Sequence, residues 1–411
     1  MLIRRSLRTG WSALACAAAL ALTAAGCGAV NGSGGSDGAI KIGGTCPLSG
    51  PTAMAGQRCT AFKAYFDYLN DKGGIKGRKV EYVLRDDAYN PSTTIQVSRQ
   101  LVERDRVIAT ADSIGTATQL AVRDYFNQKK IPQLFVASAA TPFSAEYKKY
   151  PYTMSWDVPA PISGALYAKD IATNFPGKTV AVIYQDDDAG KSYLSGFEDE
   201  AEKSGVKIVA KQGYDPTATS VTGQISALKQ SKADILVSFA VPGFTPKILA
   251  AAYSQNWSPV KYIDPGSGSN AAVLNSVAKQ AGSPDAVEGV RSGTFFKDPN
   301  DPKAASDEGI KLYKEIMAGY CKGCDVSSQY YLMGIATAWS FAEMLKSIEG
   351  DITSESILEA SKRLNQANNP FLLDGMVVAT SAEDRQPLNQ QGMAEFKDGR
   401  YVLIGDLITH S

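Results

Sequence analysis

The fold is decided by the stretch Thr179-Val180-Ala181-Val182-Ile183-Tyr184 and by the segments that follow it. This apolar run predicts a strand that is buried in a sheet. The pattern then predicts a helix over 193–204, a strand over 207–213, a helix over 221–230 and a strand over 234–239. Strands that alternate with helices of this length indicate a parallel sheet built from right-handed crossovers. The sequence therefore predicts the α/β class.

A second series of the same kind precedes this one. It opens with a strand at Ile40-Lys41-Ile42-Gly43 and a helix whose apolar residues recur at i, i+3, i+4 and i+7 from Phe62 to Leu69. The remaining predicted elements are strands over 80–84, 107–111, 133–136 and 260–263, helices over 93–103, 118–127, 162–174, 248–255, 327–348 and 354–364, and a strand-rich tail over 375–408. Two series, in a chain longer than one core usually supports, predict two α/β lobes with a cleft between them.

The first residues predict an export signal. Arg4, Arg5 and Arg8 precede an apolar run over 11–26 that is shorter than the ~20 residues a membrane-spanning helix needs. We therefore expect a signal peptide over 1–26. Its end, with Ala24 where Leu is usual, is similar to a bacterial lipobox and predicts lipidation of Cys27. Residues 27–38 are then a flexible Gly/Ser tether. Plain secretion with an incidental Cys27 is the alternative.

The charge balance argues against nucleic acid as a partner. The chain has 42 Lys and Arg and 42 Asp and Glu, and three of the basic residues but none of the acidic ones precede Cys27. After cleavage 39 basic residues would face 42 acidic ones. A protein that neutralises phosphates needs a basic excess. We therefore expect a chain that does not bind nucleic acid. Because His410 is its single His, we also expect no metal site.

Four cysteines remain beyond the leader. Exported proteins mostly oxidise their thiols, so Cys46, Cys59, Cys321 and Cys324 predict two disulfides. The economical pairing is Cys46 with Cys59 and Cys321 with Cys324. A zinc site formed by both pairs, or redox chemistry at Cys321-Lys322-Gly323-Cys324, are alternatives that the sequence leaves open.

Three stretches carry a resemblance to a known family. They are Ile40 to Gly43 with Leu48-Ser49-Gly50-Pro51, then Asn70-Asp71-Lys72-Gly73-Gly74-Ile75-Lys76-Gly77-Arg78, then Asp86-Asp87-Ala88-Tyr89-Asn90-Pro91. With these residues the chain from about residue 39 to its end resembles the leucine/isoleucine/valine-binding proteins. These are the type I periplasmic binding proteins of branched-chain amino acid importers.

The resemblance implies an architecture and partners. It implies two Rossmann-like lobes joined by a three-segment hinge, which we place at 39–157 plus 291–372 for lobe 1 and at 158–290 plus 373–411 for lobe 2. Hinge candidates lie near Asp157-Val158, Arg291-Ser292 and Leu373-Asp374. It also implies a protein that closes over one solute and delivers it to an ABC permease and its ATPase. With the lipobox-like leader, we expect a monomer without cofactors that is anchored by its lipid outside the cell membrane.

The resemblance also implies a binding site at the ends of the strands. In the family, two loops hold the ligand carboxylate through backbone N–H groups and hydroxyls. Their counterparts here contain Ser113, Gly115 and Thr116 in one loop and Ala137, Ser138 and Ala139 in the next. Loops before helix N-termini supply such donors in α/β folds. The alternative is that these residues only cap helices.

The other half of the expected site departs from the family pattern. Alignment places Gly266 where amino-acid binders carry an acid for the ammonium group, and Ala189 where they carry an aromatic residue. A buried ammonium without a counter-charge is costly. The sequence therefore predicts a bulkier carboxylate as the solute, unless Asp264 or Asp188 supplies the missing charge. Aromatic candidates for the pocket are Tyr89, Trp156, Tyr184, Phe239 and Trp257.

Other function classes find weak support in the residues. Ala189-Gly190-Lys191-Ser192 lacks the earlier Gly of a phosphate-binding loop, since Gln185 stands there. A Ser-His-Asp hydrolase would depend on His410 next to the chain end. We expect no enzyme activity. An extracytoplasmic hydrolase and a ligand-sensing receptor without a transporter are the alternatives.

Overall fold

The structure is a computed structural model that describes residues 38–50, 52–268 and 270–410, without the side chains of residues 267 and 268. The predicted signal peptide, Cys27 and all of the predicted tether but Gly38 lie outside this range. Among the described residues, none of the helices combines the length and apolar character that a membrane span requires.

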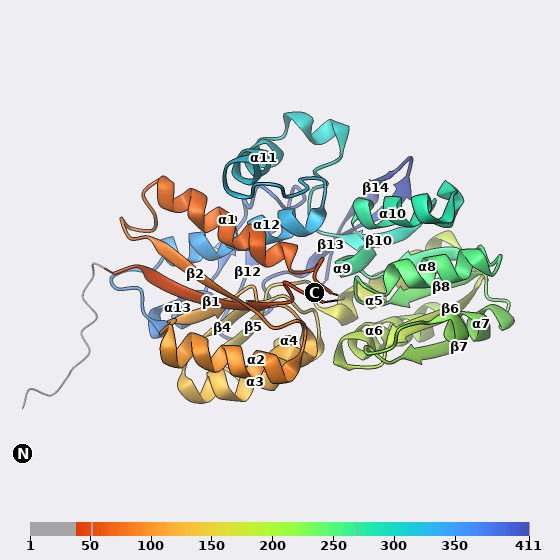
Figure 1. Cartoon of the computed structure of the whole chain (residues 1–411). Helices are drawn as coiled ribbons and strands as arrows, with labels where there is room; N and C mark the ends of the chain where they lie inside the picture. The colour runs from red at the N-terminus through yellow and green to blue at the C-terminus, as the bar shows by residue number, and fades with distance from the viewer. Residues whose placement is uncertain (1–37, 51, 269, 411) are drawn as a thin grey trace, which may run out of the picture. The chain divides into compact units, whose positions relative to one another are not determined.

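The first sheet has five parallel strands in the order β2-β1-β3-β4-β5. Helices α1, α11 and α12 supply much of one core, and α2 and α3 pack together on the opposite side of the strands (Figure 1). The strands are β1 (Ile40–Cys46), β2 (Val80–Asp86), β3 (Ala109–Ala111), β4 (Gln133–Val136) and β5 (Thr153–Ser155). The helices are α1 (Gln57–Asp71), α2 (Pro91–Arg99), α3 (Thr116–Lys129), α4 (Thr141–Ala145), α11 (Glu308–Tyr320), α12 (Gln329–Lys346) and α13 (Ser354–Ser361).

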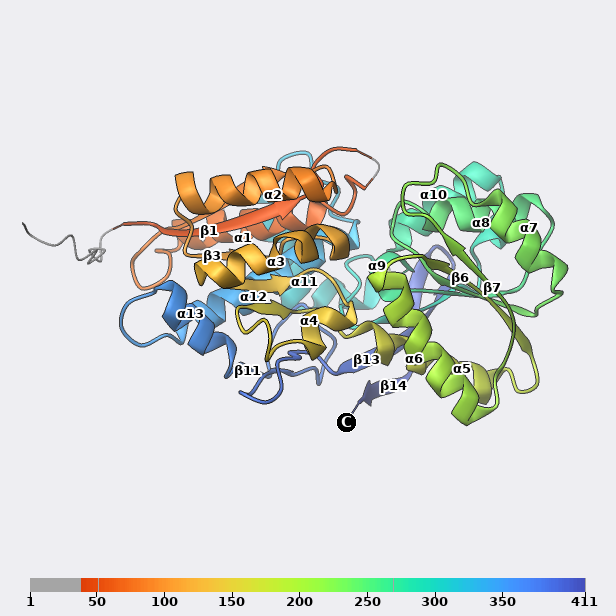
Figure 2. The same cartoon turned by 90° about the horizontal axis from the view of Figure 1, so that it is seen from below.

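The second sheet has seven strands in the order β14-β13-β10-β9-β8-β6-β7. β6 to β10 pair in parallel, and β13 and β14 complete the sheet as antiparallel strands. Helices α5 and α6 pack against each other, as Figure 2 shows. The strands are β6 (Thr179–Gln185), β7 (Lys207–Tyr214), β8 (Ile235–Phe239), β9 (Val260–Ile263), β10 (Arg291–Thr294), β13 (Gln390–Lys397) and β14 (Arg400–Thr409). The helices are α5 (Ala160–Asn174), α6 (Asp188–Ser204), α7 (Thr222–Gln230), α8 (Thr245–Ser254), α9 (Pro265–Gly268) and α10 (Ala271–Ala281).

Both sheets share one strand order that matters for function. The first five strands of each lobe run 2-1-3-4-5, so that the order reverses between β1 and β3 and again between β6 and β8. Loops on the two sides of such a reversal leave in opposite directions and open a crevice at the carboxyl ends of the strands. Each sheet therefore presents one natural binding crevice.

The strand pairing refines where the chain crosses between the sheets. β10 pairs with β9 and β13, so Arg291–Thr294 belongs to the second sheet and not to lobe 1. Met376, Val378 and Leu388 are buried in the same core as β1 and α12, whereas β13 joins the second sheet. The proposed lobe division therefore moves to the residues after Thr294 and before Gln390. The division itself stays a proposal.

Several predicted elements differ from the structure in type or extent. The helix predicted over 93–103 is α2 followed by a π-helical turn, Gln100–Arg104. In the loop expected at Asp264-Pro265-Gly266, Asp264 precedes the short helix α9, and Pro265 and Gly266 belong to that helix. Helices α10 and α11 were not predicted from the sequence. α12 is buried almost all round, since fifteen of its residues are buried, so no polar face marks its period.

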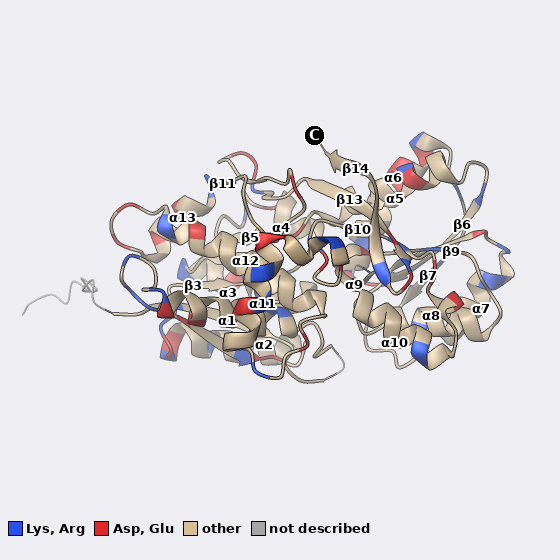
Figure 3. Ribbon diagram, turned by 90° about the horizontal axis from the view of Figure 1, so that it is seen from above, with Lys and Arg blue, Asp and Glu red and all other residues tan. Residues whose placement is uncertain are grey.

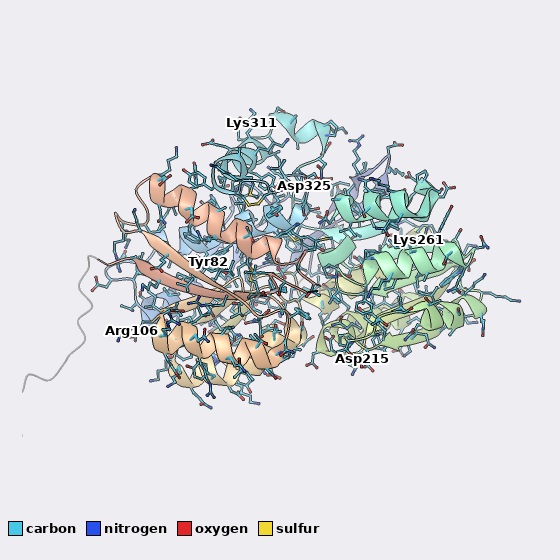
Figure 4. All side chains as sticks on the ribbon, viewed as in Figure 1. Tyr82, Arg106, Asp215, Lys261, Lys311 and Asp325 are labelled. Atoms are coloured by element: carbon cyan, nitrogen blue, oxygen red, sulfur yellow. A yellow bond between two sulfur atoms is a disulfide. The ribbon has the colours of Figure 1, made fainter. Side chains whose placement is uncertain are left out.

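Both predicted disulfides are confirmed. Cys46 pairs with Cys59, and Cys321 pairs with Cys324 (Figure 4). The first bond ties the end of β1 to the first turn of α1, and the second closes the turn after α11, before Asp325. Because all four thiols are paired in this way, they do not form the zinc site that was the alternative.

Basic and acidic residues are interspersed over the elements of both sheets, as Figure 3 shows. Many of them form exposed ion pairs, among them Lys63 with Asp67 at 2.6 Å and Lys178 with Asp234 at 3.0 Å. Exposed pairs of this kind contribute little stability. The described surface is mixed in sign, in agreement with the balanced composition.

Candidate functional site

A central cavity of about 160 Å³ lies at the carboxyl ends of strands from both sheets. Its wall includes residues that follow β3, β4, β6, β8 and β9. Of these, the loops after β3, β6 and β8 lie next to the two strand-order reversals. An engineered cavity of roughly 150 Å³ accommodates benzene, so this space suits the body of one small organic molecule.

Eight of the nine predicted ligand-binding residues lie in the wall of this cavity: Gly115, Thr116, Ala137, Ser138, Ala139, Ala189, Phe239 and Gly266. Ser113 does not. It is buried beneath the wall, where its Oγ accepts a hydrogen bond from the backbone N–H of Thr45 at 3.1 Å. Ser113 therefore joins β1 to the loop after β3. That the eight others contact a ligand stays a prediction.

The wall near the N-terminus of α3 combines hydroxyls with a helix end. The Oγ1 of Thr116 lies 2.7 Å from the Oγ of Ser138, and the N–H of Gly115 donates to the carbonyl of Ala137 at 3.3 Å. The two predicted loops are thus linked directly. A helix N-terminus carries partial positive charge, so an acceptor-rich group is favoured here.

Tyr89 reaches this helix end from the loop after β2. Ala88 and Tyr89 both have positive φ angles, 48° and 58°. Asp86 and Asp87 hold this strained backbone, because their Oδ1 atoms accept the N–H groups of Ala88 and Tyr89, each at 2.9 Å. The hydroxyl of Tyr89 lies beside the N–H of Thr116, and burial raises the pKa of this phenol.

Asp87 is fully buried and has an altered acidity. Burial raises its pKa to about 6, against the opposing effect of hydrogen bonds from the Tyr89 N–H and the Thr94 hydroxyl. The Oγ1 of Thr94 lies 3.0 Å from Oδ2 of Asp87. The two acids Asp86 and Asp87 thus fix the backbone conformation of the loop after β2 through their hydrogen bonds.

Arg58 brings a cation to the wall, and it is already paired. Its Nε donates to Asp112 at 2.7 Å, Nη1 to Asp157 at 2.9 Å and Nη2 to Thr337 at 3.1 Å. Burial opposes its charge, but Asp112 and Asp157 raise the pKa of Arg58 above its usual value. Asp157 also lines the cavity. This end of the wall is therefore acidic rather than basic.

Asp264 supplies an acid where the alignment placed Gly266. It lines the cavity at 5% exposure, and its Oδ2 accepts the N–H of Ala240 at 3.3 Å. Asp188, the other candidate, begins α6 and is not among the described lining residues. The acid is thus present two residues earlier in the chain, at the end of β9.

The aromatic wall differs from the prediction in part. Tyr89 and Phe239 line the cavity, whereas Trp156 and Trp257 are buried in cores and Tyr184 packs against one. Tyr193 stacks on Phe239 with ring centroids 5.3 Å apart.

Sequence reasoning missed several lining residues: Arg58, Asp157, Ser163, Tyr193, Phe295, Phe296, Tyr330 and Met333. Asp157 and Phe295-Phe296 follow β5 and β10, two strands that were not predicted from the sequence; recognising those strands would have pointed to these residues.

No group of three or more His, Cys, Asp or Glu residues is placed to hold a metal ion within residues 38–50, 52–268 and 270–410. The cavity therefore presents hydrogen-bonding groups and rings, with charge from Arg58, Asp157 and Asp264.

Comparisons with known proteins agree with this geometry. A family model described as periplasmic binding protein matches residues 39–400. The Leu/Ile/Val-binding protein homolog 8 of Brucella abortus is 23% identical over 375 residues, which cover 89% of this chain and 90% of that protein. A branched chain amino acid ABC transporter structure from Thermus thermophilus with bound valine has a TM-score of 0.79 at 21% identity, over 91% of this chain and 97% of that one. A solute binding protein of an ABC transporter from Rhodopseudomonas palustris, in complex with 3,4-dihydroxy benzoic acid, has a TM-score of 0.75 at 20% identity, over 90% and 97%.

Proposed function

Because the chain belongs to the family of periplasmic binding proteins, we propose that it is the solute receptor of an ABC importer of the branched-chain amino acid type. It works outside the cell membrane as a monomer anchored through lipidated Cys27, and it delivers a small organic solute to a permease and its ATPase. It performs no reaction on that solute.

The observation that carries this proposal is the composition of the cavity wall. Thr116 and Ser138 come from the first sheet's loops, and Ala189, Phe239 and Asp264 come from the second sheet's. A solute that contacts both groups of loops stabilises the arrangement in which they face each other. Binding thereby shifts a hinge equilibrium toward a closed form that a permease can recognise.

The wall also limits the kind of solute. The volume of the cavity suits one ring or one branched side chain. Aromatic rings such as Phe239 and Phe295 supply apolar surface against which that part of the solute can pack. The helix end at Thr116 favours a carboxylate. The Rhodopseudomonas neighbour holds an aromatic acid, which is of this type. We propose a small carboxylate with an apolar body.

An amino acid is the second candidate, and Asp264 favours it. The sequence argued against an amino acid because the counter-charge of an ammonium group was absent from position 266. The buried carboxylate of Asp264 in the wall removes that objection. The Thermus neighbour holds valine, a solute of this class.

A titration panel tests the function. Purified protein is titrated by calorimetry with aliphatic amino acids, aromatic amino acids, benzoates and short fatty acids. We expect micromolar or tighter binding of one class and a rise in melting temperature with the same compounds. Recovery of the bound compound unchanged after incubation supports a receptor, and its conversion contradicts the proposal. Absence of binding across the whole panel contradicts it as well.

A further inference from the structure

Two buried hydroxyls in the cavity wall have no hydrogen-bond partner. They are the Oγ of Ser163, in the first turn of α5, and the hydroxyl of Tyr330, in the first turn of α12. The residues are 1% and 3% exposed, and both line the central cavity. By contrast, the wall hydroxyls of Thr116 and Ser138 are partnered with each other.

Several other residues of the cavity wall offer these hydroxyls no partner. Val158, Phe295, Phe296 and Met333 line the same cavity, and none of them offers a strong side-chain donor or acceptor. Burying a hydroxyl without a partner costs free energy, and such groups in native proteins usually have an explanation. A polar group on the solute is the explanation that their place in the cavity wall supports.

The acids in the wall restrict what that polar group is. The charge of Asp264 contributes, after burial, to the raised pKa of Tyr330, which places the carboxylate near this phenol. Asp157 lines the same cavity. A second carboxylate on the solute would be repelled there, whereas a neutral hydroxyl both donates and accepts.

We propose that the solute carries a hydroxyl group in addition to its carboxylate, and that Ser163 and Tyr330 recognise it. The inference rests on the proposed function and names its substrate class: a small hydroxylated organic acid, with or without an amino group. Ser163 follows the first crossing between the sheets, whereas Tyr330 packs in the core of the first, so recognition by both also favours closure.

Matched pairs of probes that differ by one oxygen test this inference. They are 4-hydroxybenzoate with benzoate, tyrosine with phenylalanine, and threonine with 2-aminobutyrate. We expect at least one hydroxylated probe to bind about tenfold or more tightly than its partner, because unpaired wall hydroxyls penalise the deoxygenated analogue. Ser163→Ala and Tyr330→Phe remove only the wall oxygens. Each should bring the ratio of the two affinities, hydroxylated probe over deoxygenated partner, toward one.

Two control variants separate this role from a general effect of losing a buried hydroxyl. Ser238→Ala and Tyr401→Phe remove hydroxyls that are also buried without a partner but are not in the wall of the central cavity. They should keep the wild-type ratio.

The outcomes distinguish the two proposals. Equal affinities within every pair, or a ratio that Ser163→Ala and Tyr330→Phe leave unchanged, overturn this inference and leave the proposed function intact. Binding of none of the six probes also overturns the hydroxylated class. The proposed function falls when the wider panel gives no binding either, or when the bound compound is converted.

Discussion

The Nε of Arg58 lies 2.7 Å from Oδ1 of Asp112, and this buried ion pair joins α1 to the residue that follows β3. The same guanidinium reaches Asp157, after β5, at 2.9 Å. One cation thus holds three parts of the first lobe together at the floor of the cavity. These two ion pairs of Arg58 therefore support the wall of the cavity in which a solute would bind.

Removal of Arg58 should destabilise the protein strongly. Arg58→Met leaves Asp112 buried without its cation, and breaking a buried pair in this way typically costs about 3–5 kcal/mol. Lys63→Met is the control in the same helix, because Lys63 pairs with Asp67 at an exposed site and should cost no more than about 1 kcal/mol. Urea denaturation measures both. Equal losses in the free energy of unfolding would show that the ion pairs of Arg58 with Asp112 and Asp157 stabilise the protein no more than an exposed pair does.

The acidity of Asp87 predicts a dependence of stability on pH. Its pKa is about 6 in the folded protein and about 3.9 in an unfolded chain. The folded state therefore holds a proton that the unfolded state has lost, so this contribution is fully present below about pH 4 and disappears as the pH rises through 6. The slope is at most about 1.4 kcal/mol per pH unit.

The variant Asp87→Asn isolates this contribution. It keeps a neutral acceptor for the Tyr89 N–H but no longer titrates. Between pH 4 and pH 7 the stability of the wild type should fall relative to that of the variant. Parallel stability curves for the two proteins over this range would refute the raised pKa.

Gly115 should tolerate no side chain. Its φ is 109°, and a Cβ there would lie 2.5 Å from Oγ1 of Thr118 and 2.6 Å from Cε2 of Tyr89. Gly115→Ala should therefore cost about 1–3 kcal/mol and weaken solute binding, because the loop before α3 must move. Gly319→Ala, in a helix with open space around it, should leave both unchanged or raise stability slightly.

The two disulfides should differ in their effect on binding. Cys46, Cys59 and the wall residue Ile114 form one buried cluster, against which the wall residues Ala55 and Ala137 pack. Replacing both cysteines by serine should lower stability by about 3 kcal/mol for a loop of this length and weaken binding.

The second pair provides the control. Cys321 and Cys324 are three positions apart and absent from the described cavity wall, so their replacement should cost about 2 kcal/mol and leave affinity unchanged. Calorimetric titration of the panel and thermal melts compare the two double variants. Equal effects on affinity would show that the first disulfide does not support the wall.

Asp264 decides between the two candidate solute classes. Asp264→Asn removes the charge but keeps the shape of the side chain. If the solute carries an ammonium group, affinity should fall about thirtyfold or more, since truncating one partner of a desolvated charge pair costs about 2–5 kcal/mol. A plain carboxylate should bind equally well or better. The hypothesis of an amino acid fails if the variant keeps full affinity for every amino acid that the wild type binds.

The sequence by itself predicted the α/β class, both disulfide pairs and several of the loops that form the cavity wall, among them those after β3 and β4. These follow from local or short-range rules. Short apolar runs rich in β-branched residues, such as Thr179–Tyr184, favour buried strands, and residues that follow parallel strands lie at the sheet edge where ligands bind. Cys46 and Cys59 are close along the chain.

Only the tertiary structure decided which distant residues complete the site. Arg58, Ser163 and Tyr330 lie on three helices whose apolar periods predict burial but not a common cavity. The acid of the cavity wall is Asp264, two positions before the aligned Gly266, and an alignment alone does not specify which residues of the turn into α9 line the cavity. Periodicity specifies which face of an element is buried, whereas the neighbour it meets depends on the whole set of packed elements.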